Sequence, residues 1–163
     1  FDSTRDNFKV AATEKSYTLT LDKLEFHLRI DRIDEVAPGV HWLIDYKTRI
    51  PSPLPFEAER PEHPQILLYA LLDDAIQGLI YLTADTDVDT AYCKGVVDNT
   101  ELKKDSVNIK GLRPIQFQEY RLVWLNALRR LAHDFFHGAA APTPEKLSTC
   151  QTCEFHSLCR IHL

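Results

Sequence analysis

Apolar and polar residues alternate along the first third of the chain, which is the pattern of half-buried β-strands. Pro38 and Gly39 interrupt this pattern and predict a tight turn between two strands. We expect a β-meander in this part of the chain, with strands at residues 8–12, 17–21, 23–30 and 40–47.

The periodicity changes after residues 49–61, where four prolines exclude regular structure and predict a surface loop beside a substrate groove. Apolar residues spaced three and four apart then predict two helices. The first begins near Pro64 and runs to Ala75. The second covers residues 115–137 and ends at Gly138, with an apolar stripe of Tyr120, Val123, Leu128, Leu131 and Phe135.

Two further strands are expected between these helices, at residues 76–84 and 91–97, with an acidic turn at residues 85–87. Residues 98–112 are polar and predict a loop. Strands, helix, strands and helix in this order indicate a mixed α/β fold, with a central mixed sheet flanked by helices.

Composition indicates an ordinary folded domain, since 44% of the 163 residues are hydrophobic and 26% are charged. We therefore expect residues 1–163 to form one domain. The chain has no methionine and begins at Phe1, which predicts that it is the C-terminal part of a longer protein. No signal peptide and no membrane-spanning segment are expected.

A net charge of −5 disfavours a basic DNA-coating protein, because phosphate contacts come from lysine and arginine. It is compatible with an acidic enzyme that recruits metal ions with its carboxylates.

Asp45 and Lys47 interrupt the apolar run at residues 40–47. Side chains two apart on a strand share a face, so these two lie together while Ile44 and Tyr46 face the other way. Asp31 joins them if the two neighbouring strands pair. Two carboxylates and an ammonium group predict a divalent-metal site for phosphodiester cleavage. The alternative is a surface ion pair on a solvated edge, which contributes little.

Residues 28–48 contain the segments Arg-Ile-Asp-Arg-Ile-Asp and Ile-Asp-Tyr-Lys-Thr. They resemble the RecB-type branch of the PD-(D/E)xK nucleases, which includes the nuclease domains of RecB, AddB and CRISPR-adaptation exonucleases. The resemblance implies a restriction-endonuclease-like core in which Asp31 and Asp45 bind Mg²⁺ or Mn²⁺ and Lys47 is catalytic. Leu28 stands where the family has glycine, which predicts a narrower space beside Asp31.

Gln65 and Tyr69 resemble the Gln-x-x-x-Tyr helix that follows the catalytic strand in this family. Four residues apart, they share a helix face, from which they contact the DNA backbone or hold the lysine. The alternative is that Tyr69 is a core aromatic and Gln65 is solvated. Glu14 is a weak match to an upstream acidic metal ligand, and the family's upstream histidine has no counterpart among His27, His41 and His63.

Three of the four cysteines lie within ten residues, at Cys150, Cys153 and Cys159. Such clustering predicts metal ligands in a reducing compartment rather than a disulfide framework, so a cytoplasmic location is expected. The spacing resembles the tail of AddB-like nucleases, in which three such cysteines and one upstream cysteine hold a 4Fe-4S cluster.

Residues 148–163 are therefore expected to form a metal-binding tail, for an iron–sulfur cluster in the full-length protein or for zinc, with His156 or His162 as a further zinc ligand. Cys93 lies in a predicted strand and is expected to be a small buried apolar residue.

The leading hypothesis is a metal-dependent DNA nuclease domain, an exonuclease of DNA repair or recombination that works beside a helicase. Two alternatives remain open. One is a catalytically silent DNA-binding or scaffolding module of the same fold. The other is a zinc-stabilised interaction domain in which the strand aspartates are surface charges.

Overall fold

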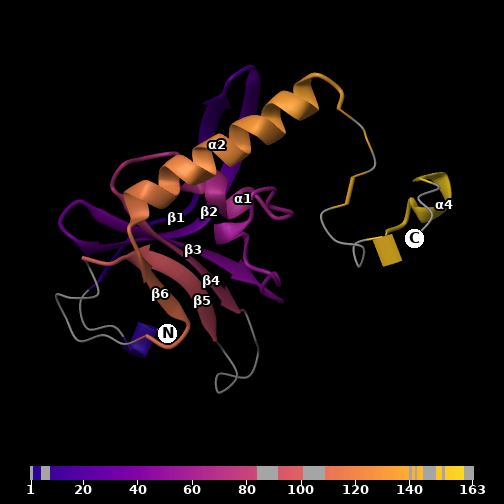
Figure 1. Cartoon of the computed structure of the whole chain (residues 1–163). Helices are drawn as coiled ribbons and strands as arrows, with labels where there is room; N and C mark the ends of the chain where they lie inside the picture. The colour runs from indigo at the N-terminus through magenta and orange to yellow at the C-terminus, as the bar shows by residue number, and fades with distance from the viewer. Residues whose placement is uncertain are drawn as a thin grey trace.

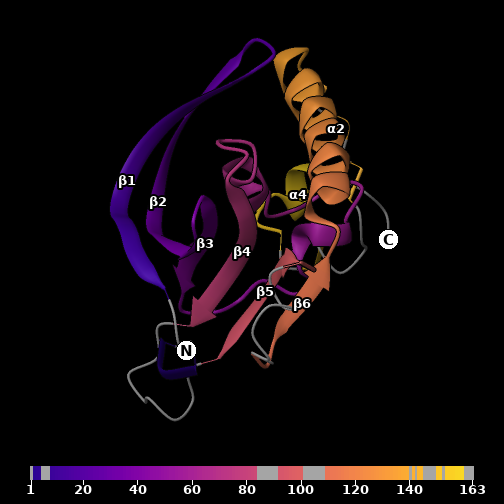
Figure 2. The same ribbon diagram turned by 90° about the vertical axis from the view of Figure 1, so that its left-hand side faces the viewer.

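A computed structural model describes residues 2–4, 8–83, 92–100, 109–139, 141, 143–144, 150–151 and 153–159. Six strands form one sheet in the order β1-β2-β3-β4-β5-β6, with α1 and α2 on its concave side (Figures 1 and 2). The strands are β1 (Lys9–Leu21), β2 (Leu24–Ala37), β3 (Val40–Lys47), β4 (Ile76–Thr83), β5 (Cys93–Asp98) and β6 (Leu112–Ile115). β3 pairs with β4, and β5 with β6, in parallel, whereas the other neighbours are antiparallel. The expected mixed α/β fold is confirmed.

The first two expected strands are one continuous strand, β1, so their separation was wrong. β1 and β2 form a long hairpin closed by Asp22 and Lys23. Asp22 has φ +54°, the left-handed conformation that a two-residue hairpin turn requires. The next turn follows the prediction, with Gly39 at φ +73° between β2 and β3.

The helix expected from Pro64 to Ala75 is much shorter, because α1 covers only Gln65–Tyr69. The chain turns instead at Asp73, whose side chain accepts a hydrogen bond from the Ala75 amide at 2.9 Å and whose carbonyl accepts one from Ile76. This turn directs the chain into β4, so the sheet connection ends the helix.

The long helix α2 covers Phe117–Phe136, close to the expected range. Its buried face was only partly predicted. Leu128 is buried, but Val123 and Phe135 are 58% and 78% exposed, and Trp124 lies in the core instead. The strand β6 was missed, because the four residues before the helix are too few to show a period.

The proline-rich segment after β3 is not a free surface loop. It contains the 3-10 helix η2 (Pro55–Glu57), in which Phe56 is buried. The indole Nε1–H of Trp124 donates to the Phe56 carbonyl at 2.8 Å. The segment is therefore attached to α2.

Apolar clusters lie on both faces of the sheet. The larger one joins the sheet to α1 and α2, and the smaller one includes Trp42, Ile44, Ile80 and Val97. Burial on both faces explains the continuous apolar sequences of β3 and β4. No helix in the described part of the chain is long and apolar enough to cross a bilayer.

Candidate active site

Asp31 and Asp45 lie side by side on neighbouring strands. The last ladder pair of β2 and β3 on this side is Arg32 with Ile44, so the next residues outward are Asp31 and Asp45. Here the backbone ladder stops, and the amide of Tyr46 donates to Oδ2 of Asp31 at 2.8 Å. The Asp31 side chain therefore replaces a backbone acceptor at the end of the β2–β3 ladder.

An interruption of the strand alternation accompanies this arrangement. Ile30 and Ile33 both lie in the larger apolar cluster although they are three positions apart, which in a regular strand would place them on opposite faces. Glu14, the residue of β1 between the partners of Ile30 and Arg32, has φ +52°. Both strands of the hairpin are therefore irregular at the level of Asp31.

Asp45 is buried, with 3% of its surface exposed. Its strand lies inside the sheet between β2 and β4, so the alternative of a solvated edge is wrong for this residue. Burial raises the pKa of the Asp45 carboxyl, the Lys47 ammonium opposes the shift, and the charge of Asp31 adds to it. Asp31 raises the pKa of Asp45 because two neighbouring carboxylates repel each other when both are charged.

Lys47 connects the Asp45 carboxylate to α1 through a directed set of contacts. Its Nζ lies 2.8 Å from Oδ2 of Asp45 and donates to Oε1 of Gln65 at 3.1 Å. The Gln65 amide donates to the Tyr69 hydroxyl at 2.8 Å, which in turn donates to the Arg29 carbonyl at 2.8 Å. This order of donors fixes the Gln65 oxygen toward Lys47.

Tyr69 is 1% exposed, so it is a core aromatic that also contributes a polar contact. Burial raises its pKa to about 12, with an added contribution from the charge of Asp45. The hydroxyl therefore stays protonated at neutral pH and remains a donor to Arg29.

Tyr81 is buried next to this site, although no sequence motif points to it. It pairs with Asp45 across the parallel β3–β4 ladder, and burial together with the charge of Asp45 raises its pKa. No local pattern predicts this neighbour, because parallel pairing joins segments separated by a helix.

The chemistry of the donors fits a hard divalent cation. Carboxylate oxygens are the ligands that Mg²⁺ and Mn²⁺ prefer. Oδ2 of Asp45 is buried without an aligned hydrogen bond from the described residues, so its contact with Lys47 leaves acceptor capacity. Asp31 uses Oδ2 for the Tyr46 amide, so Oδ1 is the oxygen that could bind a cation.

Glu14 lies at the level of Asp31 in the β1–β2 hairpin, but its side chain does not join the two aspartates. It forms an ion pair with Arg29, and both side chains are more than half exposed. Within the described residues, no three His, Cys, Asp or Glu side chains form a metal-binding group. Two carboxylates are therefore the donors that the structure assembles here.

The three tail cysteines are not assembled into a ligand set. Cys153 and Cys159 are exposed, Cys150 is half-buried, and Cys159 ends the short helix α4 (His156–Cys159). The His156 side chain and His162 lie outside the described part, as does the acidic turn at residues 85–87. Cys93 is buried in the smaller cluster, where it packs as a small apolar residue. Its Sγ lies 3.4 Å from the Lys110 carbonyl, to which the thiol is a weak donor.

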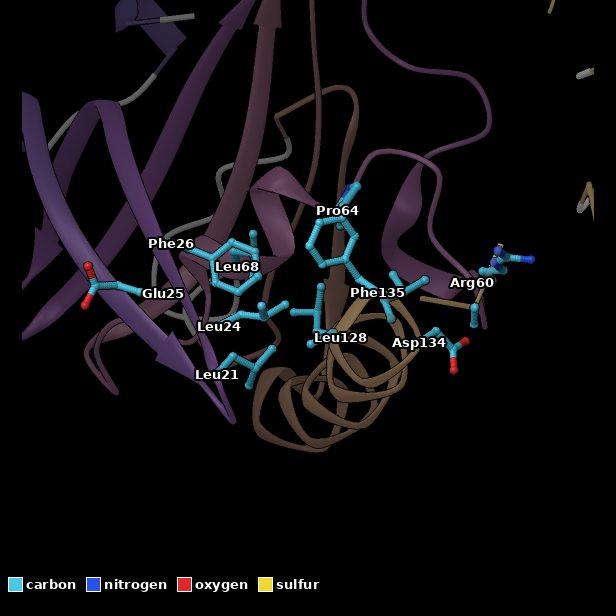
Figure 3. Close-up of a pocket in the computed structure, with 13 residues that line it drawn as sticks. Leu21, Leu24, Glu25, Phe26, Arg60, Pro64, Leu68, Leu128, Asp134 and Phe135 are labelled. Carbon is cyan, nitrogen blue, oxygen red and sulfur yellow. The ribbon is translucent and has the colours of Figure 1, made fainter. Parts of the chain in front are cut away.

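A separate groove of about 470 Å³ lies between the tip of the β1–β2 hairpin and the second half of α2 (Figure 3). Its walls are mostly apolar, with Leu24, Phe26, Leu68, Leu128 and Phe135 among them. None of the residues of the acidic site lines it, and its charged lining residues are Glu25, Arg60 and Asp134.

The sequence model of the PD-(D/E)XK nuclease superfamily matches residues 2–160. No curated protein matches the chain.

Proposed function

The chain belongs to the PD-(D/E)XK nuclease superfamily, and on that premise we propose that it is a metal-dependent DNA nuclease that hydrolyses phosphodiester bonds. Asp31 and Asp45 are the proposed ligands of Mg²⁺ or Mn²⁺, and Lys47 is the proposed catalytic cation. The observation that carries this proposal is the ion pair between the buried Asp45 and the partly exposed Lys47, which faces Asp31 and is held by Gln65 and Tyr69.

Each residue has a task that follows from its contacts. Asp45 and Asp31 concentrate negative charge at the end of β3, which attracts a divalent cation. Lys47 is one third exposed, so its ammonium can reach both Asp45 and an incoming phosphate. Gln65 holds that ammonium in one direction, so little reorganisation is needed as charge develops. A bound cation would supply charge neutralisation and a more acidic water molecule.

We further propose that the activity is that of an exonuclease in DNA repair or recombination. The segments around Asp31 and Lys47, followed by Gln65 and Tyr69, resemble the RecB-type branch in order and spacing. The same resemblance supports a helicase, as a partner or as a region of the same polypeptide.

For the tail we propose that Cys150, Cys153 and Cys159 are ligands of a 4Fe-4S cluster in the full-length protein. Their spacing and the exposure of Cys153 and Cys159 support this, since accessible cysteine side chains can bind a metal without unfolding a core. Anaerobically purified full-length protein should then be brown and absorb in the visible range. Colourless protein with stoichiometric zinc would instead support a zinc tail.

The decisive experiment is degradation of end-labelled single- and double-stranded DNA with Mg²⁺ or Mn²⁺ by the parent protein and by Asp45→Ala. A covalently closed circle separates exonuclease from endonuclease cleavage. We expect the parent to degrade the linear substrates, and Asp45→Ala to lose this activity while keeping its circular dichroism spectrum. DNA binding by the parent with no cleavage in either metal would instead support a silent binding module. Equal cleavage by the two proteins would exclude Asp45 from the site.

A further inference from the structure

Arg32 lies on the face of β2 opposite to Asp31, and its side chain is only 11% exposed. It makes two parallel hydrogen bonds to the completely buried carboxylate of Asp34, from Nε to Oδ1 at 2.7 Å and from Nη2 to Oδ2 at 3.0 Å. Such a two-point contact fixes the direction of the guanidinium plane. Arg32 is therefore rigidly attached to its own strand.

The same guanidinium group reaches across to β3. Nη1 of Arg32 donates to the Tyr46 hydroxyl at 3.3 Å. Nη1 also pairs with Asp2 in the 3-10 helix η1 (Asp2–Thr4), at 2.9 Å, and Cζ of Arg32 lies 5.3 Å from the centre of the Phe8 ring. These contacts lie on the face of β2 and β3 opposite to the acidic site.

Tyr46 is thus held at two points by adjacent residues of β2. Its hydroxyl accepts from Arg32 on one face of the sheet, and its amide donates to Asp31 on the other. Tyr46 also separates Asp45 from Lys47 in the sequence. The backbone ladder between β2 and β3 ends at Arg32 and Ile44, so these side-chain contacts hold the strands together where the two carboxylates meet.

We propose that Arg32 is a positioning residue for the metal site, which sets the distance between Asp31 and Asp45 through Tyr46 without touching the metal or the substrate. The inference rests on the proposed function, because it assumes that the two aspartates share a cation. Loss of an outer contact of this kind typically weakens metal binding by about 10- to 100-fold.

The test is calorimetric titration of Mn²⁺ into the parent, Asp45→Asn, Arg32→Lys and Tyr46→Phe proteins. Arg32→Lys keeps the charge but loses the two-point contact, so we expect the dissociation constant for Mn²⁺ to rise about tenfold. Cleavage at saturating Mn²⁺ should stay within about threefold of the parent, since Lys47 is unchanged. Tyr46→Phe removes one hydroxyl from a 39% exposed residue and should raise the constant by a smaller factor.

The matched control is Arg113→Lys. Arg113 lies on β6, pairs with exposed Glu57 and stacks near Tyr120, so the same chemical change occurs far from the site. Its Mn²⁺ affinity should equal that of the parent.

Folded Arg32→Lys with the Mn²⁺ affinity of the parent would overturn the proposal, because a purely structural role lowers the melting temperature alone. If Arg32→Lys does not fold, Tyr46→Phe decides, and an unchanged affinity in that variant overturns the proposal as well. A parent protein without Asp45-dependent Mn²⁺ binding would contradict the proposed metal site itself. The two failures are therefore distinguishable.

Discussion

The contacts from Tyr69 to Lys47 make a quantitative prediction for Tyr69→Phe. The substitution removes one oxygen from a buried ring and leaves the packing volume unchanged. It deletes two hydrogen bonds, the one accepted from Gln65 and the one donated to the Arg29 carbonyl, each 2.8 Å long. Each bond contributes about 0.5–1.5 kcal/mol to stability, so the free energy of unfolding should fall by about 1–3 kcal/mol. In a domain of this size, each kcal/mol lowers the melting temperature by about 2–4 °C.

The effect on catalysis should be smaller than that of removing the lysine. Without the hydroxyl, the Gln65 amide is free to rotate and Lys47 loses a fixed acceptor. If the loss in the transition state is that of one hydrogen bond, about 0.5–1.5 kcal/mol, the rate falls by about 2- to 13-fold. Lys47→Ala removes the charge itself and should cost about 100-fold or more.

Single-turnover degradation of end-labelled DNA at saturating Mn²⁺ measures these rates. The double variant Gln65→Ala with Tyr69→Phe is the critical comparison, because both changes interrupt the same contact with Lys47. The double variant should therefore be little slower than Gln65→Ala alone. If the fold losses of the two single variants multiply in the double variant, the indirect role of Tyr69 is refuted. A Tyr69→Phe protein as slow as Lys47→Ala would refute it as well.

Three further predictions concern the metal, the pH dependence and the fold. Asp45→Asn should abolish Mn²⁺-dependent cleavage but retain DNA binding in a gel-shift assay, and residual cleavage above one hundredth of the parent rate would contradict its role as a ligand. Because burial raises the pKa of Asp45 above its ordinary 3.8, the metal-free native state binds this proton more tightly than the unfolded state. The free energy of unfolding of the parent should therefore fall, relative to that of Asp45→Asn, as the pH rises through the raised pKa of Asp45. The affinity of the parent for Mn²⁺ should fall as the pH drops below the same pKa, because protons then compete with the metal for the carboxylate. Urea unfolding in a chelator checks the first trend, and a constant difference between the two proteins at all pH values would refute it. Gly111→Ala should destabilise the domain by about 2 kcal/mol or more, since φ is +99° and the new Cβ would lie 2.0 Å from the Cys93 carbonyl; an unchanged melting temperature would contradict this.

The local sequence determined the elements that depend on short-range pattern. Alternation predicted strands in the region of β1 and β2, Pro38 and Gly39 predicted the turn between β2 and β3, and the apolar run at residues 40–47 predicted a strand interrupted by an aspartate and a lysine. The four-residue spacing of Gln65 and Tyr69 predicted a shared helix face, which their hydrogen bond confirms. These features follow from backbone periods that a few consecutive residues are enough to express.

Long-range pairing determined the rest. The parallel neighbour β4 places Tyr81 beside Asp45 and buries a carboxylate that the sequence alone allowed to be a surface charge. The connection into β4 also shortened α1, because the sheet requires a turn at Asp73. Likewise, the ladder that ends at Arg32 brings Asp31 to the Tyr46 amide. Register, burial and the pKa of Asp45 depend on residues far apart in the chain, so only the tertiary structure could decide that Asp31 lies beside the buried Asp45 and its partner Lys47.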